Sequence, residues 1–153
     1  MVAVYRISAI AVMVEVAIQS MSVVFGIAGQ GKWIQEGGVL DKAVIEAREF
    51  VFPEVIGYLI HGLNGTILIP LTALILLVSS FFTKVPGAVK WASLVLLAVA
   101  VQITLGMSAS GLPVLGALHG LNALLLLGAA FYAARLVRRS RTADQGDRLA
   151  SRA

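Results

Sequence analysis

Cysteine is absent from this chain of 153 residues, and charged residues make up only 13% of it. Without cysteine the chain can form no disulfide, no thiolate metal site, no iron–sulfur cluster and no covalent c-type haem attachment. Soluble globular domains carry roughly 25% charged residues, which is about twice this share. The scarcity of charge therefore argues against a soluble domain, whereas the missing cysteines say nothing about the compartment.

Long apolar runs are what the chain has instead of charge. Hydrophobic residues form 59% of it, and the mean hydropathy is +0.92. A bilayer core about 30 Å thick needs about 20 apolar residues per helix, and four such runs are present. They predict transmembrane helices over about 4–29, 53–82, 89–108 and 113–137. The expected fold is an all-α integral membrane four-helix bundle over 1–137, with a kink at Pro70. The first run is too long for a cleaved signal, so we expect a retained helix.

Basic residues are divided unequally between the two ends of the predicted helices. If the N-terminus is cytoplasmic, nine of the twelve lysines and arginines lie on the inner side. These nine are Arg6, Lys84, Lys90, Arg135, Arg138, Arg139, Arg141, Arg148 and Arg152. The positive-inside rule then places both termini in the cytoplasm of a plasma-membrane protein. The basic tail, 138–153, is expected to be a disordered topology anchor rather than a nucleic-acid-binding segment.

A polar outer segment separates the first two predicted helices and has a helical pattern of its own. Apolar residues between 39 and 51 recur at i, i+3, i+4 and i+7, with most charges on the other side. The pattern predicts a short amphipathic helix over about 39–51, lying on the outer membrane face. This helix is either a simple connector on lipid or a lid over the space between the helices.

One motif occurs twice and holds the only two histidines. The letters HGLN stand at 61–64 and again at 119–122, and VAIQ at 16–19 weakly matches VAVQ at 99–102. A glutamine helix followed by a histidine helix is therefore repeated, which predicts two hairpins related by a pseudo-two-fold axis along the membrane normal. At about 1.5 Å per residue, both histidines lie roughly 10 Å below the outer ends of their helices.

Ionisable residues inside a membrane are costly and point to function. His61 and His119, at matched depth, could coordinate a metal or ligate a haem iron from both sides. Glycine follows each histidine, and Gly62 and Gly120 leave room for a flat macrocycle or a close helix. The repeat thus favours a ligand role for the histidine pair.

Asparagine lies three residues after each histidine, about one turn away on the same side. Asn64 and Asn122 could fix an imidazole tautomer or form hydrogen bonds across helices. The competing interpretation is that the whole motif only packs helices, with histidine and asparagine as interhelical hydrogen-bond partners. A zinc or copper site is less favoured because a carboxylate would have to join the histidines, and Glu54 is the candidate.

The second hairpin carries a recognisable order of motifs. VQITLG at 101–106 is followed by SGLP at 110–113 and ALH at 117–119. This order resembles the haem A synthase family, in which a Gln-x-x-Leu-Gly helix, a short turn and a histidine-bearing helix recur in each four-helix half. The chain resembles one such half.

The resemblance implies that His61 and His119 are axial ligands of one haem b per chain, near the outer surface. It also implies that Gln19 and Gln102 line the bundle at the level of the haem. The family's first half has a glutamate three residues before its first histidine and an arginine directly after it.

Tyr58 and Gly62 stand at those two positions here. The resemblance therefore implies haem binding without the synthase reaction. At the outer surface we expect Lys32 and Arg48 to contact the haem propionates.

The leading hypothesis is a membrane haem b protein with bis-histidine ligation, acting in electron transfer or haem handling in a respiratory context. The first alternative is a cofactor-free accessory or assembly subunit. The second is a small quinone-linked oxidoreductase subunit that uses Glu15, which shares a face with Gln19 near mid-membrane and is expected to be neutral or paired. The expected partners are the lipid bilayer and a respiratory complex or quinone. Enzymatic activity and homo-oligomerisation stay open.

Overall fold

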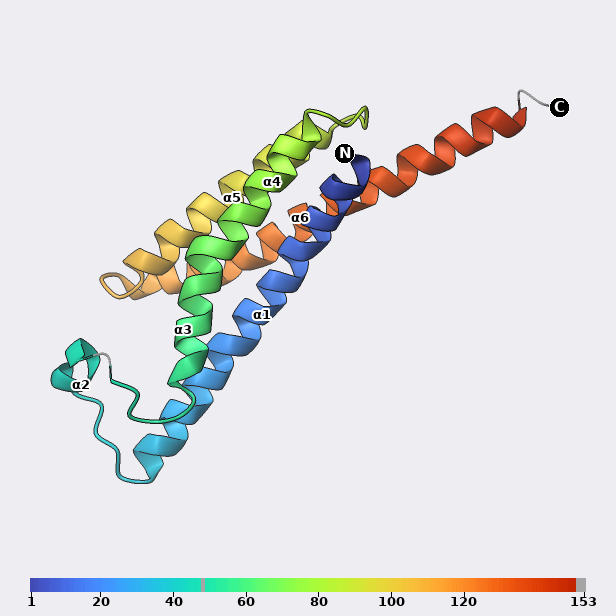
Figure 1. Ribbon diagram of the computed structural model, residues 1–153. Helices are drawn as coiled ribbons and strands as arrows, with labels where there is room; N and C mark the ends of the chain where they lie inside the picture. Colours follow the sequence, from blue (N-terminus) through green and yellow to red (C-terminus); the bar gives the residue numbers. More distant parts are fainter. Residues whose placement is uncertain (48, 151–153) are drawn as a thin grey trace.

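Four helical spans dominate the structure, a computed structural model that describes residues 1–47 and 49–150, with side chains described as far as residue 137. In chain order the elements are α1 (Val2–Gln35), α2 (Lys42–Ala47), α3 (Val55–Leu63), the π-helix η1 (Asn64–Leu68), α4 (Ile69–Ser80), α5 (Ala88–Ser108) and α6 (Pro113–Ala150). The stretches long and apolar enough to cross a membrane are Val2–Gln35, Val55–Ser80, Ala88–Ser108 and Pro113–Val137. The predicted all-helical, multi-pass membrane fold is confirmed over these described residues (Figure 1).

A seam of buried residues holds together the half of the bundle that contains the N-terminus, which is called the inner half below, the other being the outer half. In each of the four spans the buried positions are spaced by four, then three, then four residues, the spacing of knobs-into-holes packing. The seam consists of Tyr5, Ala9, Val12 and Val16 on α1, Ile69, Ala73, Leu76 and Ser80 on α4, Ala88, Ala92, Val95 and Val99 on α5, and Leu126, Ala130, Ala133 and Val137 on α6. Many members are alanine or valine, and such small side chains let membrane helices approach closely.

The helix contacts form a ring in the inner half of the bundle and leave it open in the outer half. Among the described residues, α1 packs on α3, η1, α4 and α6, α4 packs on α5, and α5 packs on α6. In the described part of the chain, α3 and α6, which carry the two histidines, are not one of these closely packed pairs. The outer ends of these helices therefore border a space that the seam does not fill.

The second span bends where α3 passes through η1 into α4 (Figure 1). The Ile69 N–H donates to the Asn64 carbonyl, five residues back, instead of four. Pro70 follows directly and has no N–H to donate, so the regular ladder is interrupted here. The kink predicted at Pro70 is thus present as a π-helical turn just before it, an arrangement that is frequent at functional sites.

Helix α1 extends six residues beyond the predicted end at residue 29. Gly29 and Gly31 do not stop it, because the first packs against α3 and the second lies in open space. The helix ends where Gly37 adopts a φ of 98°. The Gly37 N–H donates to the Ile34 carbonyl, and the Gly38 N–H donates to the Trp33 carbonyl. This pair of bonds is the Schellman ending, which glycine at the left-handed position permits.

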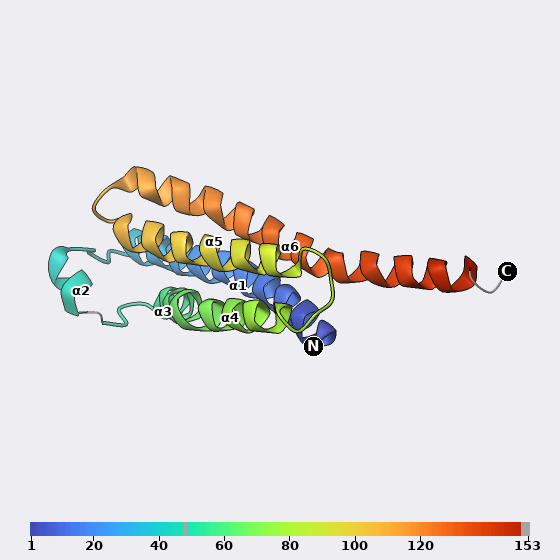
Figure 2. The same cartoon turned by 90° about the horizontal axis from the view of Figure 1, so that it is seen from above.

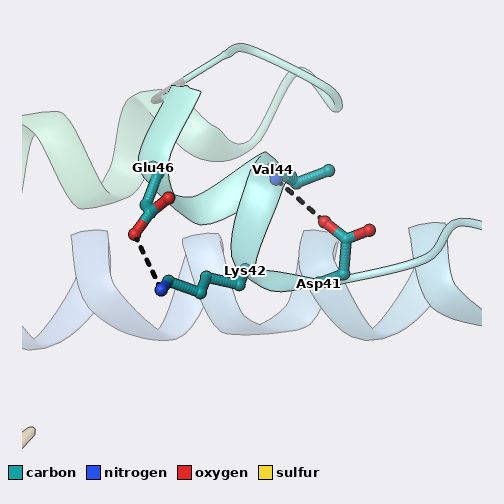
Figure 3. Close-up of polar contacts among 4 residues, drawn as sticks. All are labelled: Asp41, Lys42, Val44 and Glu46. Atoms are coloured by element: carbon teal, nitrogen blue, oxygen red, sulfur yellow. Dashed lines mark hydrogen bonds and ion pairs between the residues drawn. The ribbon is translucent and has the colours of Figure 1, made fainter.

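The outer amphipathic helix is much shorter than the 39–51 predicted, and none of its residues is buried. Asp41 begins it, because the Val44 N–H donates to Asp41 Oδ1 at 2.9 Å (Figure 3). Lys42 Nζ lies 3.5 Å from Glu46 Oε1 on its exposed surface. Six residues give too few turns to bury an apolar stripe, so the periodic pattern on either side of α2 does not become helix.

Helix α6 does not end with the membrane span, and Figure 2 shows it projecting past the other helices. Its backbone stays helical to Ala150, so the expectation of a disordered tail is wrong for 138–150. This stretch of thirteen residues contains four arginines and two alanines, and both residue types propagate an existing helix at little cost. The last part of the predicted tail, 151–153, lies outside the described residues.

Candidate functional site

The two histidines lie close together in the outer half of the bundle. Their ring centroids are 6.2 Å apart, and their planes are inclined by 54°. Both line one cavity of about 580 Å³, together with residues from all four spans. That volume falls within the roughly 300–1,000 Å³ of small-molecule and cofactor pockets. The matched depth expected from the repeat is therefore realised as one shared site.

Each histidine ring is held by the backbone of the preceding span. His61 Nδ1 lies 3.1 Å from the Gln19 carbonyl oxygen, and His119 Nδ1 lies 2.9 Å from the Gln102 carbonyl oxygen. A carbonyl oxygen only accepts hydrogen bonds, so each Nδ1 must donate and carry the proton. In a neutral ring the lone pair is then on Nε2, the arrangement that metal-ligating histidines use.

The two asparagines reinforce the same contacts from one turn further along. Asn64 Nδ2 donates to the Glu15 carbonyl at 3.1 Å, and Asn122 Nδ2 donates to the Ala98 carbonyl at 2.9 Å. Glu15 precedes Gln19 by one turn, as Ala98 precedes Gln102. The asparagines thus join helices and do not contact the imidazoles. Of the two roles considered for them, the structure shows the interhelical one, while backbone carbonyls set the tautomers.

The glutamine side chains border the cavity as expected, but they are not equivalent. The Gln102 amide donates to the His119 carbonyl at 3.0 Å, and its oxygen accepts from Asn122 Nδ2 at 2.6 Å. The Gln19 oxygen is buried and has no partner among the described residues. Its amide instead packs on Gly65, where a Cβ would overlap Gln19 Nε2. The glutamine of the repeat half that contains α1 and α3 is therefore the one whose side-chain hydrogen bonds are incomplete.

Glycines create the open space around the rings. A Cβ added to Gly62 or Gly120 would meet no atom within 4 Å, and both residues line the cavity. Gly106 has a different part, since its missing side chain lets the His119 ring lie against α5, with Cε1 only 2.9 Å from the Cβ position. The expected space beside each histidine is confirmed.

The seam of the inner core continues outward into this cavity. Residues three or four positions beyond the buried seam include Gln19, Gly65, Gln102 and Ala123, and all of them line it. Small or polar residues thus replace alanine and valine at the same helical positions. Gly65 and Gly106 were not predicted as site residues. Extending the four-three spacing outward along α5 reaches Gly106, whereas on the second span it reaches Thr66 and does not mark Gly65.

The geometry suits a metal held between two imidazoles. Two metal–nitrogen bonds of about 2 Å, with each ring centroid about 1 Å behind its nitrogen, put the centroids about 6 Å apart. The observed 6.2 Å matches that spacing. The cavity lining carries no charged side chain among the described residues and is mostly apolar. Such a lining suits a flat, apolar macrocycle, so the residues present fit a bis-histidine haem.

Two residues proposed from the sequence, Lys32 and Glu54, do not line this cavity. Lys32 Nζ lies 3.8 Å from Glu36 Oε1 in an exposed ion pair. With Glu54 it borders a separate cavity of about 250 Å³ at the outer end of α1. Arg48 lies outside the described residues. Lys32 does not line the cavity of the histidines, and its expected contact with a haem propionate stays a prediction.

The zinc or copper alternative required a carboxylate beside the histidines. Glu54 instead packs on Gly29, where a Cβ would overlap its side chain. Among the residues with described positions, no group of three histidine, cysteine, aspartate or glutamate side chains could hold a metal. Two histidines alone leave a tetrahedral ion incompletely ligated, so a metal that brings its own equatorial ligands fits better.

Comparisons of the chain with protein-family models, with curated proteins and with solved structures found no match. The functional argument therefore depends on the geometry of the cavity.

Proposed function

We propose that the chain is a membrane haem b protein in which His61 and His119 are the two axial ligands of one haem. The supporting observation is the pair of Nδ1–carbonyl hydrogen bonds, which leaves both Nε2 atoms available in one cavity with ring centroids 6.2 Å apart. The resemblance to half of a haem A synthase agrees with this proposal. Tyr58, whose hydroxyl donates to Gln30 Oε1 at 2.7 Å, stands where that family has its glutamate, so the proposal omits the synthase reaction.

A bis-imidazole haem supplies reversible one-electron chemistry, because both axial positions of the iron are taken. The role of the chain is to hold the ligands in place. The carbonyls of Gln19 and Gln102 orient the two rings and increase their basicity. The apolar lining excludes water, and helices α1 and α5 supply the rigid backbone. Electron transfer or haem handling in a respiratory membrane follows as the proposed role.

The proposed orientation places both termini in the cytoplasm and the haem in the outer half of a plasma membrane. It is supported by the excess of lysine and arginine at the inner ends of the spans. Under this orientation an electron partner would meet the haem from the outer side or from within the bilayer. A quinone or a respiratory complex is the proposed class of partner.

The competing role, packing without a cofactor, explains only part of the geometry. Asn64 and Asn122 do join helices, and so does one nitrogen of each histidine. Packing alone does not account for an open cavity bordered by Gly62 and Gly120 and shared by both rings. Helix-joining residues in a membrane are normally surrounded by close contacts rather than by space.

An absorption spectrum separates these two roles. Protein purified from haem-replete cells should show a Soret band and, when reduced, sharp low-spin α and β bands. His61→Ala and His119→Ala should each abolish the low-spin bands. Ile60→Ala and Leu118→Ala are matched controls, because these exposed neighbours do not line the cavity, and they should keep the spectrum. A colourless wild-type protein would overturn the proposal.

A further inference from the structure

Glu15 is the one carboxylate within the described parts of the four spans away from their ends, and the cavity does not use its side chain. It lies near the middle of α1. The Thr72 hydroxyl on α4 donates to Glu15 Oε1 at 2.8 Å. Glu15 Oε2 is buried and has no partner among the described residues. A half-satisfied carboxyl at this depth is costly for a purely structural contact.

Among the described residues, no cation contacts this carboxyl from the elements packed on α1. Helices η1 and α4 carry no titratable group. The Thr72 hydroxyl is bonded to the carboxyl, whereas the Asn64 amide is bonded to the main-chain carbonyl of Glu15. On α3, the Tyr58 hydroxyl is bonded to Gln30 and His61 to the Gln19 carbonyl, both further outward.

The described part of α6 contributes three titratable groups, and none of them approaches Glu15 in a recorded contact. His119 is bonded to the Gln102 carbonyl, Tyr132 stacks on Trp91 with centroids 4.2 Å apart, and Arg135 lies near the inner end of the span. On α1 itself, Arg6 is more than two turns away. A proton is therefore the cation best suited to neutralise Glu15.

Glu15 neighbours residues that line the inner end of the cavity, although its own side chain does not line it. Val16, the next residue on α1, and Ile69, three residues before Thr72 on α4, both line the cavity and belong to the seam beneath it. The Glu15 carbonyl also accepts from Asn64, which follows His61 by one turn. Gln19, one helical turn beyond Glu15 on α1, also lines the cavity, and charges in such apolar surroundings interact with little screening.

We propose that Glu15 binds a proton when an electron enters the cavity and releases it when the electron leaves. This inference depends on the proposed haem function and adds a regulatory site to it. The electron comes from a one-electron donor of the quinol class or, in a titration, from a redox mediator. One proton from water adds to Glu15 Oε2, and the carboxylate becomes a neutral acid. The added negative charge of the reduced cavity is thereby compensated, and reoxidation returns the proton to water.

The test is the midpoint potential of the purified holoprotein, measured as a function of pH. The midpoint potential of the wild type should fall as pH rises, with a slope approaching 59 mV per pH unit. This slope is expected when one proton is bound for each electron, because a tenfold change corresponds to 59 mV for a one-electron couple. Glu15→Gln keeps the side-chain size and an oxygen for Thr72 but cannot ionise, so its slope should be lost. Glu36→Gln, the same change at an exposed site directly after α1, should keep the slope.

Infrared difference spectra between reduced and oxidised protein give a second readout. Wild type should gain the carbonyl stretch of a protonated carboxylic acid on reduction, and Glu15→Gln should lack this band. Thr72→Val provides a variant that retains the carboxyl. Because it loses the donor to the carboxylate form, its pH-dependent range should move to higher pH. If the dependence of the midpoint potential on pH is unchanged in Thr72→Val, the inference is contradicted. This variant therefore tests the inference even if Glu15→Gln fails to fold.

The two proposals fail in distinguishable ways. A coloured wild-type protein whose potential does not change with pH would overturn the role of Glu15 and leave haem binding intact. A colourless wild-type protein would overturn both.

Discussion

At the scale of single residues, the site is built from backbone acceptors rather than from side-chain partners. His61 and His119 each bond a carbonyl that belongs to a glutamine, but the glutamine side chain takes no part in that bond. A carbonyl in a regular helix already accepts one hydrogen bond and has a second lone pair to offer. Any residue could supply this main-chain acceptor, so the glutamine side chains are available for other contacts. The Gln102 side chain, for example, is bonded to the His119 carbonyl and to Asn122.

The glycines beside the histidines allow the cavity to be tested without touching a ligand. Gly120→Leu should fill the space beside His119 and abolish the Soret band, while the chain still folds, because a Cβ there meets no atom within 4 Å. Leucine also favours a helix over glycine by up to about 1 kcal/mol. Gly128→Leu is the matched control on the same helix, since its Cβ position is equally open and it does not line the cavity.

Absorbance per chain and helical content by circular dichroism provide the measurement for this pair. Equal helicity with colour lost only in Gly120→Leu is the expected result. Full colour in Gly120→Leu would show that the space beside His119 is not the cofactor site.

At the scale of elements, the spans were predictable and the seam was not. Long uncharged runs mark membrane helices by length alone, and the repeated motif identified both histidines and the glycines beside them. The buried and lipid-facing sides of a membrane helix are both apolar, however, so periodicity does not separate them. On α1, for example, Val12 is fully buried while Val14 is 53% exposed.

The remaining differences between the sequence-based predictions and the structure also have physical causes, which cannot be read from composition. The π-helical turn before Pro70 depends on how α3 and α4 each pack on α1, which is a tertiary effect. The length of α2 depends on the capping bond from Asp41 and on the lack of a partner surface. Lys32 was assigned to the cavity because it lies at the outer surface, but it extends toward Glu36 instead.

The contact between α1 and α3 sets the position of His61 and can be disrupted separately. A Cβ on Gly57 would overlap the Ser22 carbonyl and lie 2.9 Å from the Gly26 backbone nitrogen. Gly57→Leu should therefore push the two helices apart, at a cost of roughly 1–3 kcal/mol for overpacking. His61 should lose its bond to the Gln19 carbonyl, and low-spin haem should fall strongly.

Unfolding in detergent micelles and the reduced spectrum measure the two effects together. Gly31→Leu is the control on α1, because its Cβ position meets nothing within 4 Å, and it should change neither stability nor colour. A Gly57→Leu protein with wild-type stability would contradict the close helix contact.

At the scale of the whole molecule, the distribution of charge and the position of the cavity agree. The inner half holds the packed seam, and the outer half holds the space shared by the histidines. Basic residues gather at the ends of the spans nearest the seam, which the positive-inside rule assigns to the cytoplasm. A stable inner half can thus carry a less tightly packed outer half, where the proposed cofactor would take the place of side chains.

The proposed orientation can be tested in living cells because the chain has no cysteine of its own. Asp41→Cys puts a thiol beside α2, and Lys84→Cys puts one in the turn between α4 and α5, where both native residues are exposed. A membrane-impermeant maleimide should label Asp41→Cys in intact cells and should label Lys84→Cys only after the membrane is opened. The parent chain should stay unlabelled in both conditions. Labelling in the opposite order would place the histidine cavity in the cytoplasmic half of the membrane and would overturn the proposed approach of electron partners from the outer side.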